Sequence, residues 1–159
     1  MAVGVSRTFL PVLALAWVFS VVCLGLSGKI MSSGTVWPSE LRNVMIQNVF
    51  AWSWNTLFTT ILLIGVAVAP RTTYFGASSN FVLLFLGFLL AIVGIGSYSG
   101  IVNKHGYAGG VSSSIGKAYH GLGFVGAFMV FFAALYAGLS YVTGQATAPP
   151  PKKEEEVHF

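Results

Sequence analysis

The chain is 159 residues long with a formal net charge of +4, and 55% of its residues are hydrophobic while only 8% are charged. Soluble domains carry roughly 25% charged residues, and so few charged side chains cannot cover the surface of a soluble domain of this size. The composition therefore argues against a soluble globular enzyme. The eight Lys and Arg residues are scattered along the chain, and this argues against a nucleic-acid partner, which needs a positively charged stripe.

Four uninterrupted apolar segments follow one another along the chain, at residues 9–27, 49–69, 81–102 and 121–143. None of them contains Asp, Glu, Lys, Arg or His, and each approaches or exceeds the roughly 20 residues that cross a bilayer as a helix. The pattern predicts an all-α integral membrane protein, a four-transmembrane-helix bundle with short loops. We expect one domain over residues 1–143 and a disordered tail over residues 144–159, where prolines precede a charged run.

The segments between the spans differ in character. Ser39 is a typical helix N-cap and Glu40 favours the first turn, so the second helix is expected to begin near residue 40. Pro70 should end that helix, and the Gly- and Ser-rich stretch 103–117 is expected to be a flexible loop.

An even number of spans places both termini on one side of the membrane. Four Lys and Arg residues fall on each side, so the positive-inside rule gives no orientation. We expect cytosolic termini, because the charged tail would otherwise have to be translocated, in the plasma membrane or an endomembrane.

Small residues recur at helical spacing within the spans, as in helices that pack closely in lipid. The fourth span offers two pairs spaced by four residues, and the first span carries small residues along one face. We expect these positions to form helix–helix contacts and to supply faces for association with further copies or other membrane proteins. They are Ala16, Ser20, Gly87, Gly94, Gly123, Ala127, Ala134 and Gly138.

The second span carries a polar row, Asn48, Asn55 and Thr59, with Trp52 on the same face. Buried amides need hydrogen-bond partners, so this row should face the bundle and not the lipid. Interhelical hydrogen bonding is the favoured role, at about 0.6 kcal/mol for each bond, and contact with a ligand or ion is the alternative.

In the fourth span, Phe128, Phe131, Phe132 and Tyr136 are expected to face lipid.

The sequence contains only weak matches to catalytic and cofactor-binding motifs. The match to a dinucleotide fingerprint at residues 121–126 opens a membrane span and follows no strand. His105 and His120 flank one loop, whereas haem ligands would face each other across a bundle. We therefore predict no catalytic, cofactor-binding or metal-binding residues and no enzyme activity, with membrane lipids as the only bound molecules.

Arg7 precedes the first span, which closes as Leu24-Gly25-Leu26-Ser27-Gly28-Lys29-Ile30. This ending, the polar-aromatic second span that stops at Pro70 and the small-residue last span are similar to fungal members of the MARVEL tetraspan family. The resemblance implies a non-enzymatic protein that organises membrane assemblies by lateral association with itself or with other membrane proteins. Two alternatives remain: a small accessory subunit of a larger membrane complex, and an uncharged oligomeric channel lined by Asn48, Asn55 and Thr59.

Overall fold

The computed structural model describes residues 9–32, 39–68, 77–105 and 113–146. Four α-helices make up these ranges, and no strand occurs in them. The helices are α1 (Phe9–Met31), α2 (Ser39–Val68), α3 (Ala77–His105) and α4 (Ser113–Ala146). The predicted tail over residues 144–159 begins too early, because α4 includes residues 144–146. The rest of that tail lies outside the described residues.

Each of the four helices is long and apolar enough to cross a membrane. The shortest is α1 with 23 residues and the longest is α4 with 34. At a rise of 1.5 Å per residue, even α1 extends about 35 Å, which exceeds the roughly 30 Å of bilayer hydrocarbon. The chain is therefore an all-α bundle of four membrane-spanning helices, as its composition predicts.

The helices extend beyond the apolar spans. α2 begins at Ser39, one residue from the predicted start. The prediction of a flexible loop over residues 103–117 was wrong at both ends, because α3 runs to His105 and α4 already begins at Ser113. Hydropathy marks only the part of a helix that lies in hydrocarbon. Backbone hydrogen bonds remain satisfied when the helix continues past that boundary, so the chain has no reason to unwind there.

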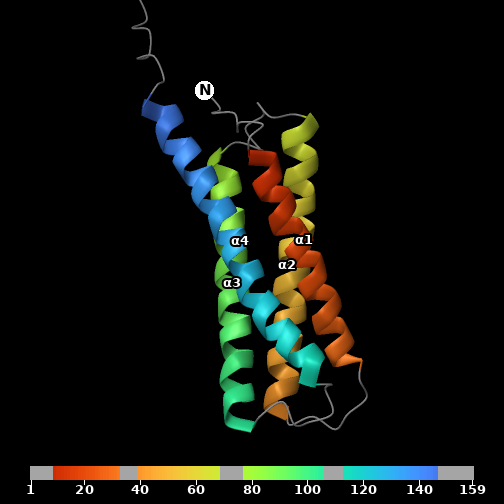
Figure 1. Cartoon of the computed structure of the whole chain (residues 1–159). Helices are drawn as coiled ribbons and strands as arrows, with labels where there is room; N and C mark the ends of the chain where they lie inside the picture. The colour runs from red at the N-terminus through yellow and green to blue at the C-terminus, as the bar shows by residue number, and fades with distance from the viewer. Residues whose placement is uncertain (1–8, 33–38, 69–76, 106–112, 147–159) are drawn as a thin grey trace, which may run out of the picture.

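The helices run alternately up and down, so α1 begins and α4 ends at the same end of the bundle (Figure 1). α1 packs against α2 and α4, and α3 packs against the same two helices. The pairs α1/α3 and α2/α4 therefore lie on the diagonals. We call the end where α1 begins the terminal end, and the end where α1 stops and α2 begins the loop end.

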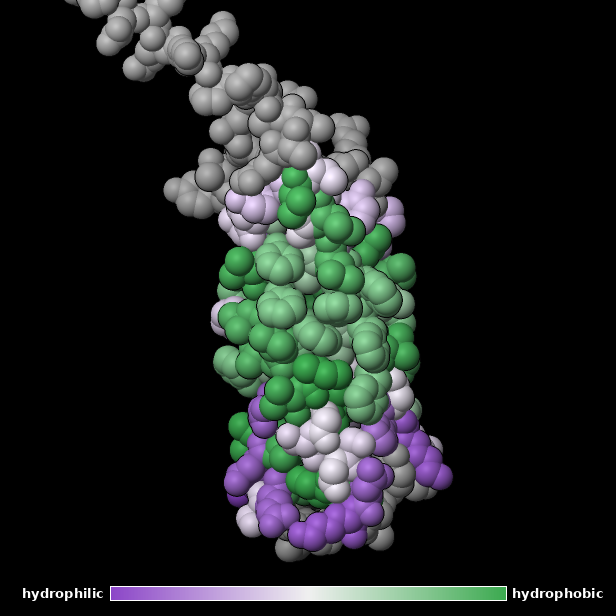
Figure 2. Space-filling model, turned by 90° about the vertical axis from the view of Figure 1, so that its left-hand side faces the viewer, coloured by the Kyte–Doolittle hydropathy of each residue, from purple (hydrophilic) through white to green (hydrophobic). Residues whose placement is uncertain are grey.

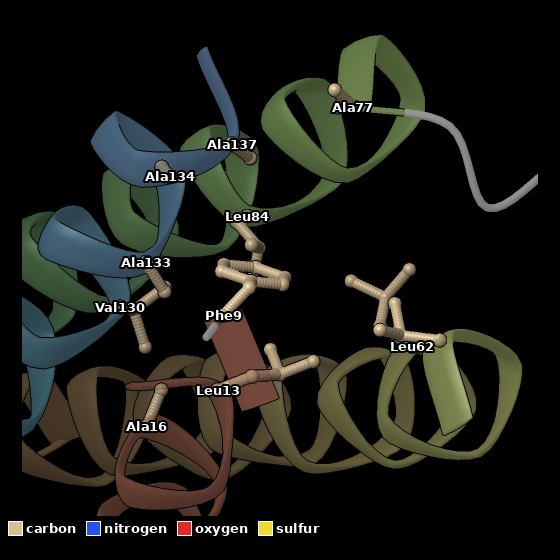
Figure 3. Packing of buried hydrophobic residues seen from close by; sticks show 11 residues of the cluster. Phe9, Leu13, Ala16, Leu62, Ala77, Leu84, Val130, Ala133, Ala134 and Ala137 are labelled. Carbon is tan, nitrogen blue, oxygen red and sulfur yellow. The ribbon is translucent and has the colours of Figure 1, made fainter. Parts of the chain in front are cut away.

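The core consists of two clusters stacked along the bundle. In the terminal-end cluster, side chains from all four helices converge around Phe9 (Figure 3). It comprises Phe9, Leu13, Ala16, Leu62, Val66, Ala77, Leu84, Val130, Ala133, Ala134 and Ala137. The loop-end cluster comprises Cys23, Ile30, Met45, Trp52, Ala91, Ile95, Tyr98, Val102, Tyr119 and Ala127.

The outer surface of the bundle is apolar over most of its height. On the face shown in Figure 2, a broad hydrophobic band covers the middle of the bundle, and polar residues gather below it at the loop end. Large aliphatic side chains lie on this surface, such as Ile64 at 61% exposed and Leu139 at 65%. A soluble protein would not tolerate so extensive an apolar surface, whereas a bilayer solvates it.

Candidate functional site

Two Asn–Gly pairs join α2 to α3. The Nδ2 group of Asn48 donates a hydrogen bond to the carbonyl oxygen of Gly94 at 2.9 Å, and that of Asn55 donates to Gly87 at 3.0 Å. The two asparagines are seven residues apart, and so are the two glycines. Seven residues are about two helical turns, so both pairs form together only when the antiparallel helices share one register.

The glycines in these pairs make room for the amide groups. A Cβ atom on Gly94 would lie 2.8 Å from Oδ1 of Asn48, and a Cβ atom on Gly87 would overlap Oδ1 of Asn55. The amide oxygens thus lie against the glycine Cα atoms, an arrangement that resembles the weak Cα–H···O contacts found between packed helices. Gly87 and Gly94 therefore act as packing residues by accepting a neighbouring side chain.

Trp52 lies on α2 between the two asparagines and crosses the centre of the bundle. Its Nε1 group donates a hydrogen bond to the hydroxyl oxygen of Tyr119 on α4 at 3.0 Å. Both side chains are fully buried. Because α2 and α4 are diagonal neighbours, this bond ties together two helices whose backbones make little contact.

Gly126 provides the space for this crossing. A Cβ atom there would lie 3.1 Å from the Trp52 ring and 3.4 Å from Sγ of Cys23. The Cys23 thiol in turn lies 3.5 Å from the carbonyl oxygen of Leu122 and donates to it. Tyr119 was not singled out from the sequence, and Gly126 was considered only as part of the rejected dinucleotide match. Their spacing of seven residues, on one helical face with the predicted packing residue Gly123 between them, is the signal that could have found them.

The predicted polar row Asn48, Asn55 and Thr59 is buried in the bundle. The hydroxyl of Thr59 donates to the backbone carbonyl of Asn55 at 2.6 Å, within its own helix. One further side-chain bond joins neighbouring helices, from Nε1 of Trp17 on α1 to the hydroxyl of Thr60 on α2 at 2.8 Å. The hydrogen bonds of these side chains therefore go either to a neighbouring helix or to the backbone of their own helix.

The predicted packing residues lie in the interior of the bundle. Ala16, Ser20, Ala127 and Ala134 are fully buried. A Cβ atom on Gly123 would contact Ile95, and one on Gly138 would contact the Phe81 ring. Since these faces are already occupied within one chain, association with another protein would have to use a different surface.

Four aromatic side chains of α4 were expected to face lipid, and two of them do so only in part, because Phe131 and Tyr136 are half-buried. Phe128 and Phe132 are exposed, as expected for lipid-facing residues. The Phe131 ring instead packs against Phe88 of α3, and the Tyr136 ring stacks on Phe9 of α1 with centroids 5.4 Å apart. Since lipid tails are as apolar as the interior, an aromatic residue is stable in either place.

Within the described residues, no three His, Cys, Asp or Glu side chains gather where they could hold a metal ion. The His120 ring packs against Tyr98 and Phe124. The side chain of His105 and all of His158 lie outside what the structure describes. The interior described here offers helix-to-helix hydrogen bonds and close packing.

No protein-family model, no curated protein and no solved structure matches the chain. The function proposed below therefore rests on the placement of its own residues, together with the sequence resemblance described above.

Proposed function

We propose that the protein is a non-enzymatic membrane scaffold that associates laterally with itself, in keeping with the resemblance to MARVEL tetraspans. We place it in the plasma membrane or an endomembrane with cytosolic termini. Association within a bilayer depends on close helix packing, because burying apolar surface gains little there. A scaffold of this kind therefore needs small residues that remain available on its outer surface.

A pair of outward-facing glycines on α3 carries the proposal. Gly96 and Gly100 are both exposed, and no atom lies within 4 Å of the position that a Cβ atom would take on either residue. The two are four residues apart, as in the GxxxG pattern through which membrane helices approach closely. Unlike the glycines in the interior, this pair is not in contact with side chains from the other described helices.

Substitution of the glycine pair tests the proposal. We expect the double variant Gly96→Leu/Gly100→Leu to lose self-association in liposomes, measured by energy transfer between labelled copies over a range of lipid-to-protein ratios. Gly121→Leu is the matched control, because Gly121 is an exposed glycine on α4 that also has open space around it. Energy transfer no higher than random mixing for the unsubstituted protein would contradict self-association, and equal losses in both variants would contradict the role of this pair.

The second candidate is an accessory subunit of a larger membrane complex. An aromatic ladder on α2 favours it: the Phe50 and Trp54 rings lie 6.4 Å apart, the Trp54 and Phe58 rings lie 4.3 Å apart, and Phe50 is exposed. Such a ladder offers a large apolar contact for another membrane protein. Purification from native membranes in mild detergent separates the candidates. An accessory subunit would appear in fixed ratio with one large complex, and a scaffold would appear as homo-oligomers.

A channel lined by the polar row would require the helices to move apart. Asn48 and Asn55 donate to carbonyl groups of α3, so a path along them would first have to open the α2–α3 contact. Conductance across a reconstituted bilayer that disappears in Asn55→Leu would favour it over the other two candidates.

A further inference from the structure

Each of the four helices carries one cation near its loop end. Lys29 lies two residues before the end of α1 and Lys104 one residue before the end of α3, while Arg42 and Lys117 lie in the opening turns of α2 and α4. All four residues are exposed. We call this set the loop-end collar, and the polar surface below the hydrophobic band in Figure 2 lies at this end of the bundle.

The collar has a large excess of positive charge. Glu40 is the only acidic residue among those that the structure describes, so four cations and one carboxylate leave a net charge of +3. The terminal-end halves of the four described helices contain no charged residue. The described part of the molecule is therefore electrically one-sided, with its charge at one membrane boundary. Lys and Arg side chains at such a boundary extend toward the lipid headgroups.

Two of these cations, Lys29 and Arg42, lie near the loop end of the seam between α1 and α2. The bond from Trp17 to Thr60 identifies the faces on which the two helices meet. Gly28 follows Trp17 by 11 residues and Arg42 precedes Thr60 by 18, which are about three and five full turns, so both lie on these faces. Because the helices are antiparallel, the difference of seven residues places Arg42 about 10 Å nearer the loop end than Gly28. No atom lies within 4 Å of the position of a Cβ atom on Gly28, and Lys29 is the next residue.

We infer that the loop end of the α1–α2 seam binds an anionic phospholipid. The phosphate lies between Lys29 and Arg42, and the open space at Gly28 receives the glycerol part of the lipid. Arg42 supplies a planar donor group suited to phosphate oxygens, and the exposed amide of the adjacent Asn43 adds a neutral donor. Lys104 and Lys117 contribute to the field that draws anionic lipids to this leaflet.

Lipid titration followed by native mass spectrometry tests the inference in neutral detergent. Phosphatidylglycerol and phosphatidylcholine with identical acyl chains are compared, which makes the result independent of the native membrane orientation. We expect the unsubstituted protein to bind the anionic lipid at least about fivefold more tightly, the factor expected from a single cation near a membrane surface. The preference should shrink as salt is raised, because screening weakens such contacts.

Two variants locate the site. Lys29→Gln/Arg42→Gln should lose most of the preference, whereas the control pair Arg7→Gln/Arg71→Gln removes the same charge from the sequence and should retain it. Gly28→Leu keeps every charge and should also lower binding of phosphatidylglycerol, because the side chain fills the seam. Equal binding of the two lipids by the unsubstituted protein, equal losses in both charge variants, or unchanged binding by Gly28→Leu would each overturn the inference.

Discussion

The two core clusters hold the same four helices together by different means. The terminal-end cluster consists of aliphatic side chains and alanines around a single aromatic ring, and its contacts are those of close packing. The loop-end cluster contains Trp52, Tyr119 and Cys23, each of which makes a hydrogen bond to another helix. The buried side chains of the terminal-end cluster are thus held by close packing, with the half-buried Trp17–Thr60 hydrogen bond beside them. Those of the loop-end cluster combine close packing with hydrogen bonds of their own.

The difference matters because packing and hydrogen bonding specify different things in a membrane. Apolar surfaces slide past one another at little cost when lipid is equally apolar, so small residues set how closely helices approach. A hydrogen bond to a particular carbonyl fixes which turn of one helix meets which turn of the next. The paired contacts of Asn48 with Gly94 and of Asn55 with Gly87 do this for α2 and α3.

The largest effect is expected from Trp52→Ala. The substitution removes the largest side chain of the loop-end cluster and leaves the buried Tyr119 hydroxyl without its donor. We expect a loss of about 3–5 kcal/mol in the free energy of unfolding, measured by denaturant titration in mixed micelles. Trp54→Ala is the matched control on the same helix, since Trp54 is only partly buried, and it should cost far less. Similar losses of unfolding free energy in the two variants would show that the loop-end cluster contributes no more to stability than the half-buried surface around Trp54.

The four helices could be predicted from the sequence, because a long apolar segment in hydrocarbon must satisfy its own backbone hydrogen bonds. Residues 49–69 can be solvated only by lipid or by other helices, and a helix is the structure that satisfies their backbone there. The polar row was predictable for a related reason, since Asn48 and Asn55 are costly to place against lipid.

The partners of these residues could not be predicted. Apolar residues gain little in the interior relative to lipid, so hydropathy does not predict that Phe131 and Tyr136 pack in part against other helices. The same holds for Tyr119, whose role depends on a tryptophan 67 residues away in the chain. These pairings follow from the relative register of the helices, which a single sequence does not reveal.

An intermediate effect is expected from adding one methyl group to a glycine in a polar contact. Gly94→Ala should lower the free energy of unfolding by about 1–2 kcal/mol, because its Cβ atom would lie 2.8 Å from Oδ1 of Asn48, whose amide group is held in place by two hydrogen bonds from Nδ2. Gly121→Ala on α4, where the Cβ atom would have open space around it, should be neutral or slightly stabilising.

The same substitution at the terminal end distinguishes the two kinds of contact. A Cβ atom on Gly138 would lie 3.0 Å from the Phe81 ring, which can rotate away because no hydrogen bond restrains it. Gly138→Ala should therefore cost less than about 1 kcal/mol by the same measurement. A loss at Gly138 as large as that at Gly94 would mean that packing fixes the helix register as firmly as the amide pairs do.

The smallest effect isolates the diagonal hydrogen bond itself. Trp52→Phe and Tyr119→Phe each remove one partner of the bond while keeping an aromatic ring. The double-mutant cycle subtracts the cost of each single change, including the volume lost at Trp52, and so reports the coupling between the two. We expect about 0.6 kcal/mol, and no more than about 1.7 kcal/mol, as for other hydrogen bonds between membrane helices. A cycle of Tyr119→Phe with Trp17→Phe is the control and should be additive, because Trp17 bonds to Thr60 instead. Coupling near zero in the first cycle would leave Trp52 as a space-filling residue, and the two clusters would then differ in composition alone.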